Sequence, residues 1–187
     1  MALYFRTTLK ADQFHLPDDI HPFECLGLLI HLNTGSDFLL LAIYLGHEAD
    51  AFPAATFIRL LSLHPRTVII GDFNARHTAW GCVSRNTRGS QLYNLLQARD
   101  ELYLIAANEP THIPHRGQPT NIDIVLTNWD AINELECLHI FSSDHLPIGF
   151  TIPGHSPLRP SPKRLDVRKA NWDDFRKLLP KSAYHLI

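Results

Sequence analysis

The chain has 187 residues, of which 45% are hydrophobic and 19% charged, as in ordinary globular proteins. Its 17 basic and 19 acidic side chains give a formal net charge of −2, which argues against a protein that grips nucleic acid by charge alone. The cysteines form no CxxC pattern and no HExxH is present, so zinc-finger and zincin sites are not supported. The longest apolar stretch, residues 38–45, is far shorter than the roughly 20 residues that cross a bilayer. We expect an intracellular protein, nuclear or cytoplasmic, with reduced thiols and no membrane partner.

Apolar runs of strand length recur along the chain, at residues 2–5, 25–32, 38–45, 67–73, 102–106, 121–127 and 146–152. The turn-rich phrase NTGSD (33–37) predicts a hairpin between the second and third of these runs. Runs that are apolar on both faces indicate strands covered on both sides. Residues 54–64 and 89–100 repeat apolar side chains at three- and four-residue spacings and predict two helices. This order predicts an α/β fold in which helices pack outside sheets.

A domain boundary is expected after Ile152. The phrase PGHSPLRPSPKRLD (153–166) holds four prolines and cannot sustain a helix or a central strand. We therefore expect a domain over 1–152, a Pro-rich linker over 153–170 and a short helical extension over 171–187.

The first candidate site phrase is VIIGDFNARH (68–77), in which a buried strand leads into Asp72 and Asn74. Alternation along an extended strand would put both side chains on one face. A carboxylate can then orient or deprotonate a water while the amide donates to a phosphate oxygen. An Asx turn that merely ends the strand explains the same residues equally well.

Two further phrases place polar residues beside apolar strands. In NIDIVLTN (121–128), Asp123 lies inside a strand-like run, where a buried carboxylate needs a partner. In SSDHLPIGF (142–150), Asp144 and His145 point apart if extended, so each can meet a residue from another strand. A His145–Asp123 pair would raise the basicity of the imidazole and fix its tautomer. The alternatives are a hydrogen bond from Asp123 to a nearby loop and a solvated turn at residues 143–145.

Taken together, these phrases resemble the endonuclease/exonuclease/phosphatase superfamily, and most closely the endonuclease domain of jockey-like non-LTR retrotransposons. The resemblance is carried by five ordered phrases: GDFNARHTAWG (71–81), RGSQL (88–92), EPTH (109–112), NIDIVLTN (121–128) and SSDHLPI (142–148). It implies a four-layered αββα sandwich of the DNase I-like type. It also implies a metal-dependent nuclease, with Mg²⁺ as the cofactor or Mn²⁺ in its place, that nicks DNA and leaves a 3′-hydroxyl to prime reverse transcription.

Matched by motif, the resemblance implies a role for each candidate residue. Asp72 would activate the attacking water, and Asn74 would help to hold the phosphate. His145 would contact a non-bridging phosphate oxygen, with Asp123 supporting the imidazole.

The remaining matched positions are Asp144 and Tyr44. Asp144 would lie near the metal, and Tyr44, at the end of LLLAIY, would be a further phosphate ligand. Tyr44 departs from the family pattern, because LGHEADAFP replaces the usual proline-containing loop after it.

A larger departure concerns the start of the family pattern, which has a strand carrying an asparagine and then a strand carrying a metal-binding glutamate. Only Glu24 and Glu48 precede Asp72, and neither lies in such a phrase. The sequence therefore predicts a domain incomplete at its N-terminus, with weak Mg²⁺ binding and impaired cleavage, because octahedral Mg²⁺ would rely on few carboxylates. The polymerase domain of the parent element is not expected in this chain.

Two other functions stay open at this point. The first is a non-catalytic remnant that binds DNA or protein, for which the basic residues of the tail give slight support: Arg159, Lys163, Arg164, Arg168 and Lys169. The second is a phosphatase or phosphodiesterase of the same superfamily, although HTAWG and EPTH favour the retrotransposon branch.

Overall fold

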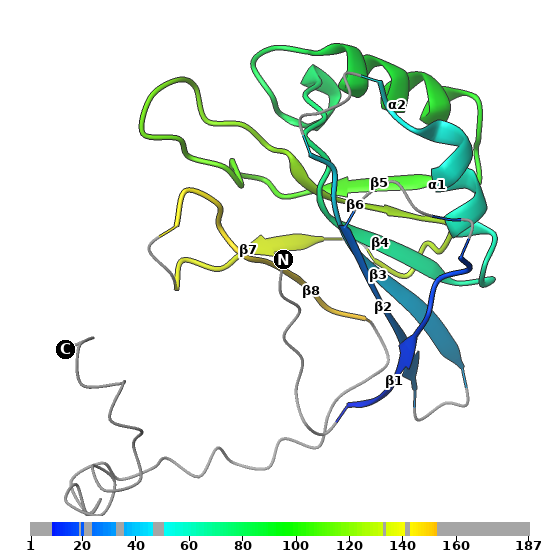
Figure 1. The fold of residues 1–187 in the computed structure, drawn as a ribbon. Helices are drawn as coiled ribbons and strands as arrows, with labels where there is room; N and C mark the ends of the chain where they lie inside the picture. Colours follow the sequence, from blue (N-terminus) through cyan, green and yellow to red (C-terminus); the bar gives the residue numbers. More distant parts are fainter. Residues whose placement is uncertain are drawn as a thin grey trace, which may run out of the picture. The chain divides into compact units, whose positions relative to one another are not determined.

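The fold is described from a computed structural model (Figure 1). It describes residues 9–18, 20, 24–32, 36–46, 51–132, 134–140 and 143–152. All of them belong to the first of two units, which span residues 1–155 and 156–187. The strand expected at 2–5, the linker at 153–170 and the extension at 171–187 lie outside the described residues.

A six-stranded mixed sheet forms the centre of the first unit. Its strands, in spatial order, are β1 (Lys10–Phe14), β2 (Glu24–His31), β3 (Asp37–Tyr44), β4 (Thr67–Asp72), β6 (Asp123–Thr127) and β5 (Tyr103–Ala106). Only the β3–β4 pair is parallel; the other neighbours run antiparallel. The predicted hairpin around 33–37 is confirmed by the antiparallel pairing of β2 with β3.

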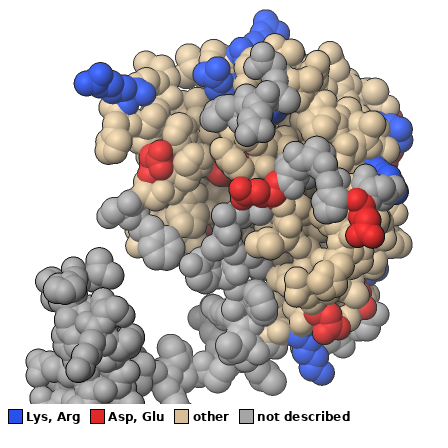
Figure 2. Space-filling view, viewed as in Figure 1, with Lys and Arg blue, Asp and Glu red and all other residues tan. Residues whose placement is uncertain are grey.

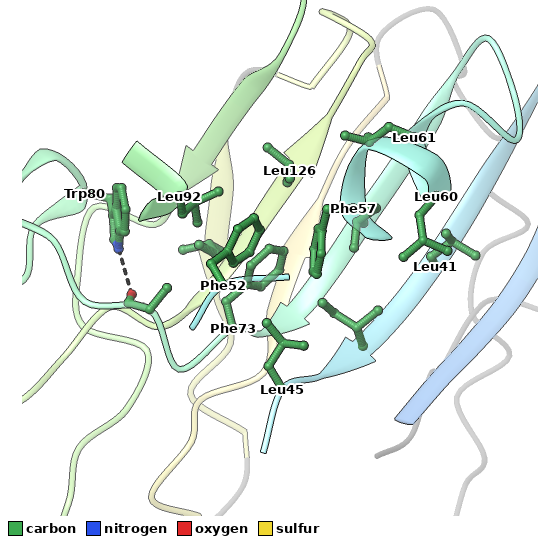
Figure 3. Packing of buried hydrophobic residues seen from close by; sticks show 14 of the residues in the cluster. Leu41, Leu45, Phe52, Phe57, Leu60, Leu61, Phe73, Trp80, Leu92 and Leu126 are labelled. Carbon is green, nitrogen blue, oxygen red and sulfur yellow. Dashed lines mark hydrogen bonds between the residues drawn. The ribbon is translucent and has the colours of Figure 1, made fainter. Parts of the chain in front are cut away.

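Two α-helices cover one face of this sheet: α1 (Ala54–Leu61) and α2 (Thr87–Gln97) (Figure 1). Both were predicted, although each is shorter at its C-terminal end than its apolar pattern suggests. Their apolar sides pack on the odd-numbered residues of β3, and Figure 3 shows the aromatic centre of this core. The ring of Phe57 lies 4.6 Å from that of Phe52 and 5.3 Å from that of Phe73, between centroids.

The opposite face of the sheet carries a second core. A hairpin of β7 (Leu135–Cys137) and β8 (Ile148–Phe150) packs there on even-numbered residues of β3 and β4, including Leu40 and Val68. β3 is thus covered on both faces, as its continuous apolar run predicts. The described residues therefore form three of the four expected layers: helices, large sheet and small sheet.

β1 and β7 were not predicted from the sequence because neither is an apolar run. β1 reads KADQF and is mostly exposed, so main-chain pairing with β2 holds it in place. His31 reinforces this edge, since its ring lies 2.9 Å from Asp12 and 3.1 Å from Asp37. Polar edge strands of this kind give no periodic apolar signal.

Two expectations from the sequence concern a membrane partner and the redox state of the thiols. No described helix combines the length and apolar character that crossing a bilayer requires. Cys25, Cys82 and Cys137 are free thiols. Burial raises the pKa of Cys25 to about 11, so this thiol stays protonated and unreactive.

Asn86 begins α2 and ties it to the candidate site. Its side-chain oxygen accepts the N–H of Gly89 at 2.8 Å, and its amide donates to the carbonyl of Asn74 at 2.9 Å. We expect Asn86→Ala to lower the free energy of unfolding by about 1–2 kcal/mol, the usual cost of a lost N-cap. Urea unfolding measures this, with Asn94→Ala on the exposed side of the same helix as the control. Equal effects of the two substitutions would contradict the capping role.

Candidate active site

Four side chains form a row across the end of the large sheet. Glu24 lies opposite Tyr44, Tyr44 opposite Asp72, and Asp72 opposite Asp123, on strands β2, β3, β4 and β6. Residues directly opposite each other in a sheet project from the same face, with Cβ atoms about 5 Å apart. This face is the one on which β7 and β8 pack. The register therefore brings three of the predicted site residues together, with Glu24 at the outer end.

Gly71 determines how closely β3 and β4 approach just before Asp72. Its φ is +145°, and a Cβ built there would lie 1.9 Å from the carbonyl oxygen of Ile43. No side chain fits this position, and the backbone conformation is one that glycine alone adopts readily. The glycine of the GDFN phrase thus allows Asp72 to lie beside Tyr44.

The structure corrects the predicted geometry of Asn74. β4 ends at Asp72, and Asn74 has a left-handed φ of 47°, so strand alternation does not extend to it. Oδ1 of Asp72 accepts the Asn74 main-chain N–H at 2.8 Å, which is the Asx turn considered as the alternative. The Asn74 amide donates to the carbonyl of Leu45 at 2.9 Å and to Oδ2 of Asp72 at 3.1 Å. In this arrangement Asn74 orients Asp72 and its amide is not directed at solvent.

The RGSQL phrase holds the strand ends from the helix side. Arg88 is buried, and its guanidinium donates to the carbonyls of Leu45, Gly46 and Phe73. Gly89 lets α2 approach the loop after β4, since a Cβ there would lie 1.9 Å from a backbone oxygen. The phrase therefore supports the site without contributing a reacting group.

The HTAWG end of the first phrase is also structural. Trp80 donates its indole N–H to the carbonyl of Ala75 at 3.0 Å (Figure 3). His77 stacks on Tyr93 at 4.4 Å between ring centroids and caps a short 3₁₀ helix, Thr78–Trp80. These contacts fix the path of the chain after Asn74.

The predicted pairing of His145 with Asp123 is present. Nδ1 of His145 lies 2.9 Å from Oδ2 of Asp123, whose side chain is 13% exposed. Thr111 of the EPTH phrase holds this strand end, because its hydroxyl oxygen accepts the main-chain N–H groups of Ile122 and Asp123. The alternative, in which Asp123 bonds only a nearby loop, does not describe this geometry.

Three carboxylates act on the pKa of His145. The hydrogen bond to Asp123 raises the pKa of His145 most; burial opposes this, and the charges of Asp123, Asp72 and Asp144 add to the rise. For Asp144, desolvation would raise the pKa, but a backbone hydrogen bond and the neighbouring imidazoles outweigh it, so that the pKa is lowered. His145 is therefore held toward its cationic form and Asp144 toward its anionic form.

This pairing predicts a pH effect. Asp123→Asn should lower the pKa of His145 toward its ordinary value of 6.5, as followed by NMR of the ring proton. Because the folded-state pKa is raised, the pair stabilises the fold fully below pH 6.5, and this stabilisation is lost as the pH rises through the raised value. An unchanged His145 titration in the variant would contradict the hydrogen bond as the main cause.

Sequence reasoning quoted His112 in a motif but gave it no place in the site. Its main chain bridges to those of Thr120 and His145, and its ring lies 4.4 Å from the ring of His145 between centroids. Its Nε2 lies 3.8 Å from Oδ2 of Asp144. The EPTH phrase beside the Asp–His pairing was the available signal, but sequence alone did not show that the two segments pair.

The charges at this end of the sheet suit a divalent cation. Asp123 lies 2.9 Å from His145, Asp144 offers an oxygen within 4.8 Å of a ligand atom of His145, and Asp72 lies opposite Asp123, so three carboxylates gather at this end of the sheet. Hard divalent cations take carboxylate oxygens and keep several waters. In the view of Figure 2, one group of acidic side chains lies near the middle of the face and others lie nearer its edges, while Lys and Arg side chains lie toward the margins. Asp144, which is half exposed, is the candidate ligand.

Comparison with known proteins gives the family. The sequence model of the endonuclease-reverse transcriptase family matches residues 39–149, more than half of the chain. The chain belongs to this family. The matched segment contains every predicted site residue: Tyr44, Asp72, Asn74, Asp123, Asp144 and His145.

The relatives agree with the predicted jockey-like branch. The chain is 38% identical over 95 residues to a probable RNA-directed DNA polymerase from transposon X-element of Drosophila melanogaster, covering 46% of this chain and 10% of that protein. It is 28% identical over 124 residues to the RNA-directed DNA polymerase from mobile element jockey of Drosophila funebris, covering 64% and 13%. The chain thus spans only about a tenth of the length of these relatives.

Comparison with solved structures tests the expected fold. The endonuclease domain of TRAS1, a telomere-specific non-LTR retrotransposon, superposes with a TM-score of 0.64 at 22% identity, covering 80% of this chain and 71% of that domain. The α/β fold expected from the sequence, of the DNase I-like endonuclease/exonuclease/phosphatase type, is therefore confirmed. This similarity shows the fold alone.

Proposed function

We propose that this domain is a divalent-metal-dependent DNA endonuclease that hydrolyses one phosphodiester bond and leaves a 3′-hydroxyl. The observation that carries the proposal is the hydrogen bond of His145 to Asp123 at the end of one sheet, with Asp72 opposite Asp123 and an oxygen of Asp144 within 4.8 Å of a ligand atom of His145. Such hydrolysis needs a carboxylate that activates water, a cationic side chain that binds the phosphate and a further carboxylate that holds a metal.

Asp72 is the proposed base. It takes a proton from water as the water oxygen bonds to phosphorus and the bond from phosphorus to O3′ breaks; O3′ takes up a proton from solvent. Asn74 donates to Oδ2 of Asp72 and so aims the other lone pairs of this carboxylate. Asn74 acts in this scheme as a positioning residue.

His145 and Tyr44 are the proposed phosphate contacts. With Nδ1–H donated to Asp123, a protonated His145 presents Nε2–H to a non-bridging oxygen. Tyr44 lies beside Asp72 in the row and can reach the same phosphate. Mg²⁺, or Mn²⁺ in its place, would be held by Asp144 and would supply Lewis-acid stabilisation of the developing charge.

The wider role is proposed from the relatives. Their names describe RNA-directed DNA polymerases of mobile elements, so the nick would serve as a primer for the polymerase of the parent element. Of the two other functions, the basic tail that favoured a DNA- or protein-binding module lies outside the described residues. The phosphatase alternative predicts release of phosphate from small esters.

The test is conversion of supercoiled plasmid to open circles, with the chain in molar excess and millimolar MgCl₂. We expect slow nicking, because few carboxylates would hold Mg²⁺. EDTA should stop it, and a DNA polymerase should extend the nicks without prior end repair. Hydrolysis of inositol phosphates without plasmid nicking would favour the phosphatase alternative and would overturn the proposal.

A further inference from the structure

We propose that His112, Asp144 and His145 form a site for a borderline divalent cation such as Zn²⁺, and that its occupation inhibits the proposed nicking reaction. One potential ligand atom from each of the three side chains lies within 4.8 Å of the others. The inhibitory part rests on the proposed function, whereas the binding part stands on the geometry of the three side chains.

The backbone holds the two histidines next to each other. His112 and His145 face each other in an isolated antiparallel bridge. Two short main-chain hydrogen bonds flank it, from Ile113 to the carbonyl of Asp144 at 2.6 Å and from Leu146 to the carbonyl of Thr111 at 2.7 Å. The ligands thus come from two paired segments and are already close together.

On both histidine rings, a neighbouring side chain contacts the same nitrogen, Nδ1. Nδ1 of His145 lies 2.9 Å from Asp123, and Nδ1 of His112 lies 3.2 Å from the hydroxyl of Thr120. Such partners fix the tautomer of a metal-binding histidine and direct its other nitrogen at the metal. The coordinating atoms are then the two Nε2 atoms and a carboxylate oxygen of Asp144.

This ligand set discriminates between cations. Two imidazoles and one carboxylate suit Zn²⁺ and its spectroscopic substitute Co²⁺, whereas Mg²⁺ and Mn²⁺ favour oxygen ligands. Ligand atoms around tetrahedral Zn²⁺ lie roughly 3.3 Å apart, given bonds of about 2.0 Å. The three ligand atoms lie within 4.8 Å of one another. Small side-chain rotations, which the half-exposed Asp144 permits, would bring them to the spacing around Zn²⁺.

Occupation of the site has a direct chemical consequence. A cation on Nε2 of His145 replaces the proton that this nitrogen would donate to a phosphate oxygen. It also engages Asp144, the proposed Mg²⁺ ligand. Zn²⁺ therefore competes with both the DNA phosphate and the activating metal, and His112 distinguishes the inhibitory site from the activating one.

The binding test is titration of the whole chain with Co²⁺ alone, followed by its visible absorption. We expect one Co²⁺ with a tetrahedral spectrum, displaced by Zn²⁺, and affinity at least about tenfold weaker in His112→Asn and in Asp144→Asn. His115→Asn, an exposed histidine three residues away, is the matched control and should bind as the wild type does. Asp144→Asn keeps the test valid if His112→Asn does not fold, since Asp144 is exposed.

The inhibition test compares each protein with its own nicking rate before Zn²⁺ is added. We expect the half-inhibitory Zn²⁺ concentration to rise at least about tenfold in His112→Asn and to stay unchanged in His115→Asn. Equal Co²⁺ affinity in wild type and both site variants would overturn the proposal while leaving the nuclease proposal standing. Site-dependent Co²⁺ binding without any nicking would uphold the site and refute the proposed reaction.

Discussion

Asp72→Asn is expected to lower the rate of plasmid nicking at least about 100-fold, the scale of a lost general base. The amide keeps an oxygen that can accept the Asn74 main-chain N–H, so the turn after β4 should survive. It cannot take a proton from water at neutral pH. Single-turnover nicking in MgCl₂ measures the loss, and the thermal unfolding midpoint shows that the fold persists.

The matched control is Asp100→Asn, which changes the charge equally at an exposed position after α2. It should nick at the wild-type rate. A loss in Asp100→Asn as large as that in Asp72→Asn would mean that overall charge, and not the base, limits the reaction. Retention of activity by Asp72→Asn would assign the proton transfer to another group.

Gly71→Ala carries the largest expected effect on stability, a decrease in the free energy of unfolding of about 3 kcal/mol. The added Cβ would meet the carbonyl of Ile43 at 1.9 Å, in a conformation with φ of +145°. Backbone strain and overpacking each cost about 1–3 kcal/mol. The unfolding midpoint should fall by roughly 10 °C for a chain of this size, as followed by circular dichroism.

Gly46→Ala is the control for Gly71→Ala. A Cβ at Gly46 would meet nothing closer than the Tyr44 ring at 3.7 Å, an ordinary contact. Its effect should stay within about 0.5 kcal/mol, as at most surface positions. If both substitutions destabilise equally, the close approach of β3 and β4 is not what Gly71 provides.

The strands of the core could be predicted because burial on both faces leaves continuous apolar runs. Their register could not. The phrase NTGSD indicates a hairpin but no register; a pairing shifted by two residues would put Leu26 opposite Tyr44, where the structure places Glu24. A shift of this size keeps the same face toward the core, so the apolar pattern does not distinguish the two registers. It nevertheless decides that a carboxylate, Glu24, joins the row.

The Asp–His pair of the site could be predicted because each of its residues has one obvious role in its surroundings. Asp123 lies in an apolar strand and needs a partner, and His145 was the available cation. For Asn74 the sequence left strand alternation and an Asx turn open, because local sequence fits both conformations, and the left-handed backbone of Asn74 decides for the turn. His112 was not placed because its neighbour His145 is 33 residues away and is joined through a single bridge.

We propose that the paired His145 at the end of the sheet takes part in metal-dependent hydrolysis of DNA. The measurement that tests it most directly is single-turnover nicking of supercoiled plasmid in MgCl₂ by wild type, His145→Ala and His115→Ala. We expect at least about a 100-fold loss in His145→Ala alone, with EDTA stopping the nicking by the other two proteins. Equal nicking by all three proteins, or nicking that persists in EDTA, would contradict it.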